Sequence, residues 1–150
     1  MRTVIQRVNR AQVKIDESVV ASIEKGLCCL VGIESGDTEA DMEYTARKIC
    51  NLRIFDDEKS FMNLDINDVQ GEVLLVSQFT LLGDARKGRR PSFSDAEKSE
   101  KAKEIFDSLV KQMEGFLPCR IKTGVFQAMM EVSIINDGPV TLLLDSRKII

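Results

Sequence analysis

The stretch Glu72-Val73-Leu74-Leu75-Val76-Ser77-Gln78-Phe79-Thr80-Leu81 decides the fold. Its apolar run from Val73 to Val76 is typical of a strand that is covered on both faces. Ser77, Gln78 and Thr80 then place three polar side chains at the end of this strand. Buried polar groups are costly without partners, so these side chains either emerge into solvent or form a site. Taken by themselves, the residues slightly favour emergence into solvent.

The segments around this strand predict a single α/β domain over residues 1–150. Further strands are expected at 2–8, 11–15, about 19–23, 27–33, about 119–124, 130–135 and 140–145. One helix is expected to follow an N-cap at Thr38, and a second to start at a capping box of Ser94 and Glu97 and to end at Gly115 and Pro118. Residues 56–71 are polar and are expected to form a loop. This order indicates two helices packed on one side of a sheet.

Composition and charge exclude several classes of protein. The chain has 150 residues, of which 43% are hydrophobic and 30% charged, and this is typical of one globular domain. Neither a signal peptide nor an apolar run of about 18 residues is present, so we expect a cytoplasmic protein without a membrane span. The net charge is −3, and a nucleic-acid partner would therefore require a local basic patch.

The chain contains no histidine, which excludes Ser-His-Asp and Cys-His catalysis and histidine-bound zinc. Its cysteines, Cys28, Cys29, Cys50 and Cys119, form no Cys-x-x-Cys pair. We expect buried, reduced thiols, with no metal and no cofactor.

Two further segments are informative. Asn136-Asp137-Gly138-Pro139-Val140-Thr141 consists of turn-forming residues and predicts a tight turn between two strands. On sequence statistics alone, a cis bond before Pro139 has a frequency of only about 5–6%. Arg86-Lys87-Gly88-Arg89-Arg90-Pro91-Ser92-Phe93 forms a basic loop, which is either simply solvated or contacts RNA phosphates.

Together these segments resemble the D-aminoacyl-tRNA deacylase family, also described as D-tyrosyl-tRNA(Tyr) deacylases. The similarity extends in order along the chain through MRTVIQRV at 1–8, NLRIF at 51–55, MNLD at 62–65, SQFTL at 77–81, RKGRRPSF at 86–93, NDGPVT at 136–141 and LLLDS at 142–146. One departure is Gln127, which follows Phe126 where the family usually has glycine, and Ala128-Met129-Met130 also vary from the usual pattern. This departure concerns the shape of the adenosine pocket, while the motifs at 77–81 and 136–141 are intact.

The resemblance implies a three-layer β/β/α fold and a homodimer with its active sites at the interface. The implied activity is hydrolysis of the ester of D-aminoacyl-tRNA, assisted by the tRNA 2′-hydroxyl, with L-aminoacyl-tRNA rejected and glycine mischarged on tRNA(Ala) also cleared. The implied catalytic residues are Ser77, Gln78, Phe79 and Thr80. A cis Gly138–Pro139 bond would form the chiral filter, supported by Arg7, Asn136 and Thr141. Phe126 and Met130 would line the adenosine pocket, and Arg86, Lys87, Arg89 and Arg90 would contact tRNA.

Three alternatives remain. The protein could be a non-catalytic RNA- or DNA-binding module that uses the loop at 86–93. It could be a related editing deacylase that tolerates L-amino acids, although such enzymes replace the Ser-Gln that stands here at 77–78. It could also be a purely structural dimer, which would leave the polar end of the strand at 72–81 unexplained.

Overall fold

The computed structural model describes residues 1–118 and 120–149, so Cys119, the first residue of the strand expected at 119–124, lies outside the described part. The strands are β1 (Arg2–Ile15), β2 (Ser18–Ile23), β3 (Gly26–Gly32), β4 (Phe55–Asp56), β5 (Met62–Leu64), β6 (Glu72–Ser77), β7 (Ile121–Thr123) and β8 (Glu131–Asp145). The helices are α1 (Glu39–Asn51), the 3-10 helix η1 (Phe79–Leu82) and α2 (Ser99–Phe116). None of the described helices is both long and apolar enough to cross a membrane.

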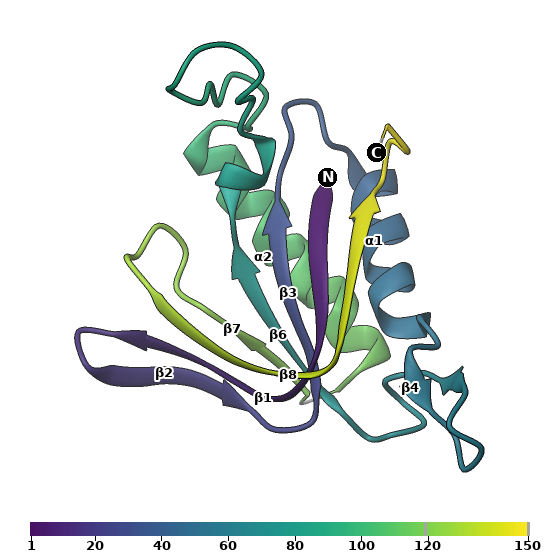
Figure 1. Cartoon of the computed structure of the whole chain (residues 1–150). Helices are drawn as coiled ribbons and strands as arrows, with labels where there is room; N and C mark the ends of the chain where they lie inside the picture. The colour runs from purple at the N-terminus through teal and green to yellow at the C-terminus, as the bar shows by residue number, and fades with distance from the viewer. Residues whose placement is uncertain (119, 150) are drawn as a thin grey trace.

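One strongly bent sheet contains most of the strands (Figure 1). The first half of β1 pairs antiparallel with β3, and its second half pairs antiparallel with β2. β8 pairs with β1 along both halves, from Arg2–Asp145 to Lys14–Glu131, and the two strands bend together. β6 lies between β3 and β7 and is parallel to both. The bend folds the sheet over on itself, and α1 and α2 cover one side of it.

The bend creates two cores and therefore three layers. In β3 and β6, Leu27, Cys29, Val73 and Leu75 face the helices, where they pack against residues such as Leu109. The alternate residues of the same strands face the other part of the sheet, where Cys28, Leu74 and Val76 pack with Val13 and Ile23. The prediction that these apolar runs are covered on both faces is confirmed, as are the single α/β domain and the placement of both helices on one side.

The N-cap prediction for the first helix is confirmed, and the one for the second is wrong. The Thr38 backbone N–H donates to the Asp41 carboxylate at 2.8 Å, which closes one half of a capping box. Ser94 does not cap α2, whose N-cap is Lys98. The reason is that the preceding backbone pairs with the segment after β3, since Glu97 N–H donates to Ile33 at 2.9 Å.

Three strand predictions also need correction. β6 ends at Ser77, because the chain turns into η1 instead of continuing to Leu81. Residues 56–71 are not all loop, since β4 and β5 form a very short antiparallel pair. The expected turn at 136–141 is not a turn between two strands: β8 is one continuous strand, whose pairing with β1 shifts register near Val8.

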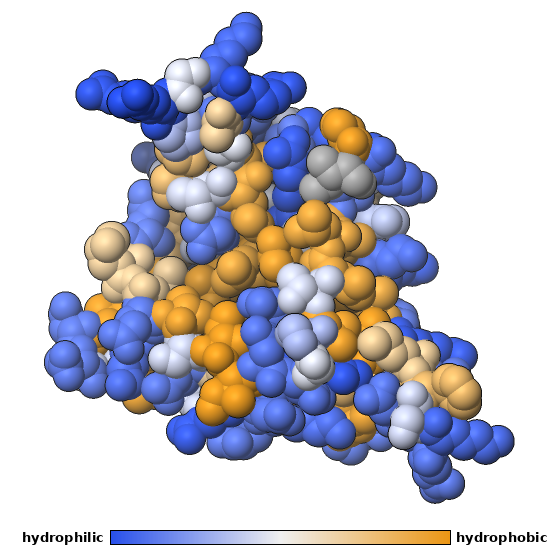
Figure 2. Space-filling view, in the orientation of Figure 1, coloured by the Kyte–Doolittle hydropathy of each residue, from blue (hydrophilic) through white to orange (hydrophobic). Residues whose placement is uncertain are grey.

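β8 lies at the edge of the sheet and exposes apolar side chains. Among the described strands it pairs with β1 alone. Ile135 and Leu143 of this strand are 58% and 68% exposed. Figure 2 shows apolar side chains gathered across the middle of this face of the molecule.

A buried ion-pair network joins the two ends of the chain. The α-amino group of Met1 donates to Asp37 at 2.7 Å and to the Ser146 hydroxyl at 2.8 Å. The fully buried Asp37 side chain also accepts the Glu34 backbone N–H at 2.8 Å and pairs with Arg147 at 3.2 Å. Asp37 therefore balances the charge of a buried ammonium group.

We expect Asp37→Asn to lower the free energy of unfolding by about 3 kcal/mol, because it leaves a buried cation without its main counter-charge. Denaturant unfolding measures this change. The matched control is Asp107→Asn in the exposed pair between Asp107 and Lys103, which should cost about 0.5 kcal/mol or less. Equal effects of the two substitutions would contradict the role given to Asp37.

Candidate active site

The polar end of β6 turns abruptly into η1. The Gln78 backbone N–H donates to Val31 of β3 at 2.7 Å, after which the chain leaves the sheet. Gly32 permits this close approach, since a Cβ there would lie 2.4 Å from the Leu82 side chain. Phe79 and Thr80 are the first two residues of η1. Their backbone N–H groups have no acceptor within the helix, because no helical turn precedes them. Among the residues that the structure describes, these two backbone donors have no hydrogen-bond acceptor.

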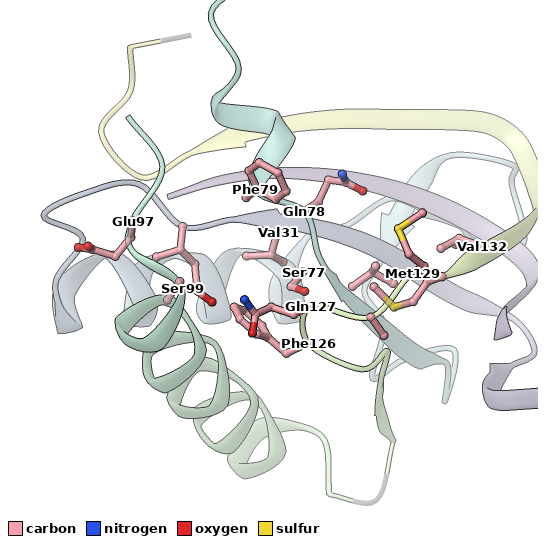
Figure 3. A pocket seen from close by; sticks show the side chains of 15 residues that line it. Val31, Ser77, Gln78, Phe79, Glu97, Ser99, Phe126, Gln127, Met129 and Val132 are labelled. Atoms are coloured by element: carbon pink, nitrogen blue, oxygen red, sulfur yellow. The ribbon is translucent and has the colours of Figure 1, made fainter. Parts of the chain in front are cut away.

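A cavity of about 580 Å³ opens beside this turn (Figure 3). Its volume falls in the range of small-molecule sites. Apolar side chains form most of its walls, while hydroxyl, amide and carboxylate groups lie at its margins. Its lining residues are Val31, Ile33, Val76, Ser77, Gln78, Phe79, Glu97, Ser99, Ala102, Phe126, Gln127, Ala128, Met129, Met130 and Val132.

The structure brings two of the sequence-predicted groups together in this cavity. Ser77, Gln78 and Phe79 line one side, and Phe126 and Met130, about fifty positions later, line another. Thr80 is not among the lining residues, but its hydroxyl accepts a 2.5 Å hydrogen bond from the Gln78 side chain. Thr80 is thus linked to the cavity through its neighbour.

Phe126 and Met130 are each held by a core: Phe126 packs against the core beneath the helices, and Met130 packs against the second core. The Phe126 ring lies 6.1 Å from the Phe106 ring of α2. A Cβ at Gly124 would lie 2.7 Å from the Met130 sulfur, so this glycine makes room for Met130. Both side chains are therefore preformed apolar parts of the lining.

The titratable groups near the cavity do not provide a general base poised near neutral pH. Glu97 is the one acidic side chain in the described lining, and hydrogen bonds from the Lys98 backbone and the Lys101 ammonium lower its pKa. Outside the lining, burial raises the pKa of the Cys28 thiol to about 11 and that of Cys50 to about 12, so neither is a ready thiolate. Cys28, Cys29 and Cys50 are buried and unpaired, as expected. The site is suited to positioning and polar stabilisation.

The Gly138–Pro139 peptide bond is cis, which confirms the expectation drawn from the family resemblance. Gly138 has φ +122°, and a Cβ there would lie 2.9 Å from the Val140 nitrogen, so only glycine suits the position. Both residues are exposed. Neither lines the cavity of its own chain, so the structure does not join them to Ser77 and Gln78 within one subunit.

Arg7 holds the segment before this bond. Its guanidinium donates to the Asp137 carbonyl at 3.2 Å and to the Ile54 carbonyl at 2.6 Å. It also forms ion pairs with the carboxylates of Asp137 at 3.1 Å and Asp56 at 3.4 Å. The side chain is only 6% exposed, so water screens these contacts weakly.

Asn136 and Thr141 flank the cis bond on β8. They pair with Val8 and Gln6 of β1, and both are exposed. These two residues therefore pair with β1 on either side of the cis bond.

The basic loop stands apart from the cavity but touches its rim. Arg86 forms a bidentate ion pair with Asp84, in which its guanidinium donates a hydrogen bond to each carboxylate oxygen. These hydrogen bonds lower the pKa of the Asp84 carboxyl group. Lys87, Arg89 and Arg90 are exposed. The Phe93 ring packs edge-on against Phe79 with centroids 5.1 Å apart. Three cations therefore remain available close to one edge of the cavity.

The sequence-based prediction did not identify Glu97 and Ser99 as lining residues. Glu97 was assigned to a helix cap. Gln127, whose departure from the family pattern concerns the adenosine pocket, does line the cavity, although the sequence gives its side chain no role.

We expect Arg7→Lys to loosen the segment around the cis bond. Lysine keeps the charge but cannot reach two carbonyl groups and two carboxylates together, so the free energy of unfolding should fall by about 2 kcal/mol. Amide hydrogen exchange should quicken at residues 136–141. The matched control is Arg10→Lys on the same strand, whose exposed pair with Glu24 spans 3.9 Å and should contribute little. Unchanged exchange at 136–141 would refute the anchoring role.

Comparison with known proteins agrees with this architecture. Residues 4–145 match the family model described as D-Tyr-tRNA(Tyr) deacylase. The chain is 54% identical to a D-aminoacyl-tRNA deacylase from Caldicellulosiruptor saccharolyticus and 56% identical to one from Kosmotoga olearia, with 99% of each chain covered.

Two solved structures share the fold. One is described as a c-Myc DNA unwinding element binding protein; it has a TM-score of 0.92 and 41% identity, and the match covers 97% of this chain and 98% of that one. The other is described as a probable eukaryotic D-amino acid tRNA deacylase; it has a TM-score of 0.83 and 13% identity over 95% and 97% of the two chains, and shows the fold alone. On the family model and the curated relatives, the chain belongs to the D-Tyr-tRNA(Tyr) deacylase family.

Proposed function

We propose that the protein is an editing hydrolase that cleaves the ester between a D-amino acid and the 3′ end of tRNA. Its curated relatives are named for this reaction. The observation that carries the proposal is the cavity itself, in which Ser77 and Gln78 stand at one margin and the apolar wall of Phe126 and Met130 at another. Acting on tRNA, the enzyme would work in the cytoplasm.

The cavity accommodates the terminal adenosine, and the ester then lies at the polar end of β6. A flat base fits between apolar walls, and the wall of Phe126 and Met130 offers such a surface. Beside the rim, the phosphates of the tRNA are contacted by the exposed side chains of Lys87, Arg89 and Arg90. Arg86 joins them when it exchanges its ion pair with Asp84 for a phosphate. These contacts bind tRNA irrespective of the amino acid that it carries.

Hydrolysis requires a positioned water molecule and support for the oxyanion that forms when water attacks the ester carbonyl. The free backbone N–H groups of Phe79 and Thr80 supply that support, while Ser77, Gln78 and the Thr80 hydroxyl orient the substrate. The 2′-hydroxyl of the terminal adenosine assists the attacking water. This role suits a site without histidine and without a carboxylate of raised pKa.

The main chain of a second copy of the protein distinguishes a D-aminoacyl group from an L-aminoacyl group. Gly138 and Pro139 are exposed, lie on an edge strand and do not reach the cavity of their own chain. The exposed apolar side chains Ile135 and Leu143 on the same strand favour a homodimer with its active sites at the interface. Held by Arg7, the rigid Gly138–Pro139 backbone would lie beside the α-carbon and exclude an L side chain.

We expect D-tyrosyl-tRNA and glycyl-tRNA(Ala) to be hydrolysed and L-tyrosyl-tRNA to persist. A steric wall rejects bulk on one side of the α-carbon, and glycine has no side chain to reject. The measurement follows release of labelled amino acid from the three substrates at one enzyme concentration. If glycyl-tRNA survived at concentrations that clear D-tyrosyl-tRNA, the steric account would fail.

We expect Thr80→Ala to lower kcat about 10- to 100-fold without abolishing turnover, since it removes one hydrogen-bonding group and no nucleophile. A threonine hydroxyl without an adjacent base is a weak nucleophile. Single-turnover deacylation of D-tyrosyl-tRNA measures the change. Complete loss with substrate affinity intact would instead support a covalent threonine mechanism.

The main alternative is a non-catalytic nucleic-acid-binding module. The basic loop supports it, as does the similarity to the 41% identical structure, which is described as a DNA unwinding element binding protein. The substrate comparison above separates the two, because a binding module leaves the ester of D-tyrosyl-tRNA intact. Hydrolysis of both enantiomers would instead identify a deacylase that tolerates L-amino acids.

A further inference from the structure

We propose that the Gln127 carboxamide recognises the 6-amino group of an adenine bound in the cavity, and so selects adenosine at the 3′ end of the substrate. The carboxamide oxygen would accept from the 6-amino group, and the carboxamide nitrogen would donate to the neighbouring ring nitrogen. This inference rests on the proposed function and assigns a specificity-determining residue to the same site.

The backbone of Gln127 is held where glycine would fit better. The Ala128 N–H donates to the Val125 carbonyl at 3.2 Å, so residues 125–128 form a tight turn with Gln127 in its third position. Gln127 has φ +63°, in the left-handed region that side chains disfavour. A residue that keeps its side chain at such a position is a candidate for function.

The side chain of Gln127 faces the cavity without a partner of its own. Gln127 lines the cavity, and Figure 3 shows it beside Phe126, pointing into the open space. Within the described part of the chain its carboxamide makes no hydrogen bond. Its donor and its acceptor are therefore both available to a ligand.

A second glutamine in the same backbone region shows what a structural role looks like. Gln70 has φ +52°, and its side chain donates to the Asn67 carbonyl at 2.7 Å. Gln70 lies in the loop before β6 and is not among the residues that line the cavity. Local hydrogen bonding thus accounts for Gln70, whereas it does not account for Gln127.

The chemistry of the cavity favours adenine as the partner. Val31, Val132 and Phe126 provide apolar walls for a flat ring, and Gln127 provides a polar group at the ring's edge. A carboxamide carries a donor and an acceptor side by side, which matches the 6-amino group and the adjacent ring nitrogen of adenine. Purine riboside has the same ring without the 6-amino group, so it would leave the carboxamide oxygen unpaired.

The test uses two compounds that carry D-tyrosine through a 3′-amide, which resists hydrolysis. One is built on adenosine and the other on purine riboside. For the unmodified protein, calorimetry should give about 10-fold tighter binding of the adenosine compound, as one well-placed hydrogen-bonded pair supplies. In Gln127→Gly and Gln127→Ala this ratio should fall close to one. The alanine variant keeps a Cβ, so it separates loss of the carboxamide from relief of the backbone.

Gln70→Gly is the matched control and should leave the 10-fold ratio unchanged. A ratio that stays the same in both Gln127 variants, or a ratio near one in the unmodified protein, would overturn the inference. Cleavage of D-tyrosyl-tRNA is measured on the same preparations. Cleavage with an unaltered ratio removes the role of Gln127 alone, whereas absence of cleavage in the unmodified protein removes the proposed function.

Discussion

The pairing of β1 with β8 is the constraint on which the rest of the structure depends. β1 cannot pair with β3 and β2 on the same side at once, so its two halves take one partner each, and β8 follows it across the bend. The bend encloses the second core, in which Val13 and Leu74 pack. It also brings Arg7 of β1 opposite Asp137 of β8. The layer structure and the exposed cis segment therefore have one origin.

The end of β6 serves the site for a related reason. Once Gln78 has donated to Val31, the chain turns into η1 and leaves the N–H groups of Phe79 and Thr80 unpaired. A longer strand would have used these donors in the sheet. Polar side chains that would be costly at the centre of the sheet instead line a cavity at its end, where a ligand can satisfy them.

The sequence predicted the elements better than their connections. Continuous apolar runs identified β3 and β6, and Thr38 identified the start of α1, because each signal acts over a few neighbouring residues. The segment at 136–141 contains the residues of a turn, yet its two ends pair with β1, Asn136 with Val8 and Thr141 with Gln6, so it stays within one strand through a tertiary effect. A tertiary contact also explains the wrong helix cap. Ser94 and Glu97 have the local pattern of a capping box, but the Glu97 backbone N–H donates to Ile33, just after β3. Only the family resemblance assigned both Phe126 and Ser77 to the site, because no local sequence pattern links two residues so far apart in the chain.

A cavity without a poised acid or base limits how the protein can accelerate a reaction. Hydrogen bonds lower the pKa of Glu97, the one titratable side chain in the described lining, so no described group of the lining changes its protonation near neutral pH. Such a site can work on an ester that is already labile, where placement of water and fixed backbone dipoles suffices. Rigidity also suits the selection that we propose, because the Gly138–Pro139 main chain would not adapt to an L side chain. On this view the fold provides selectivity first, and the substrate provides much of the reactivity.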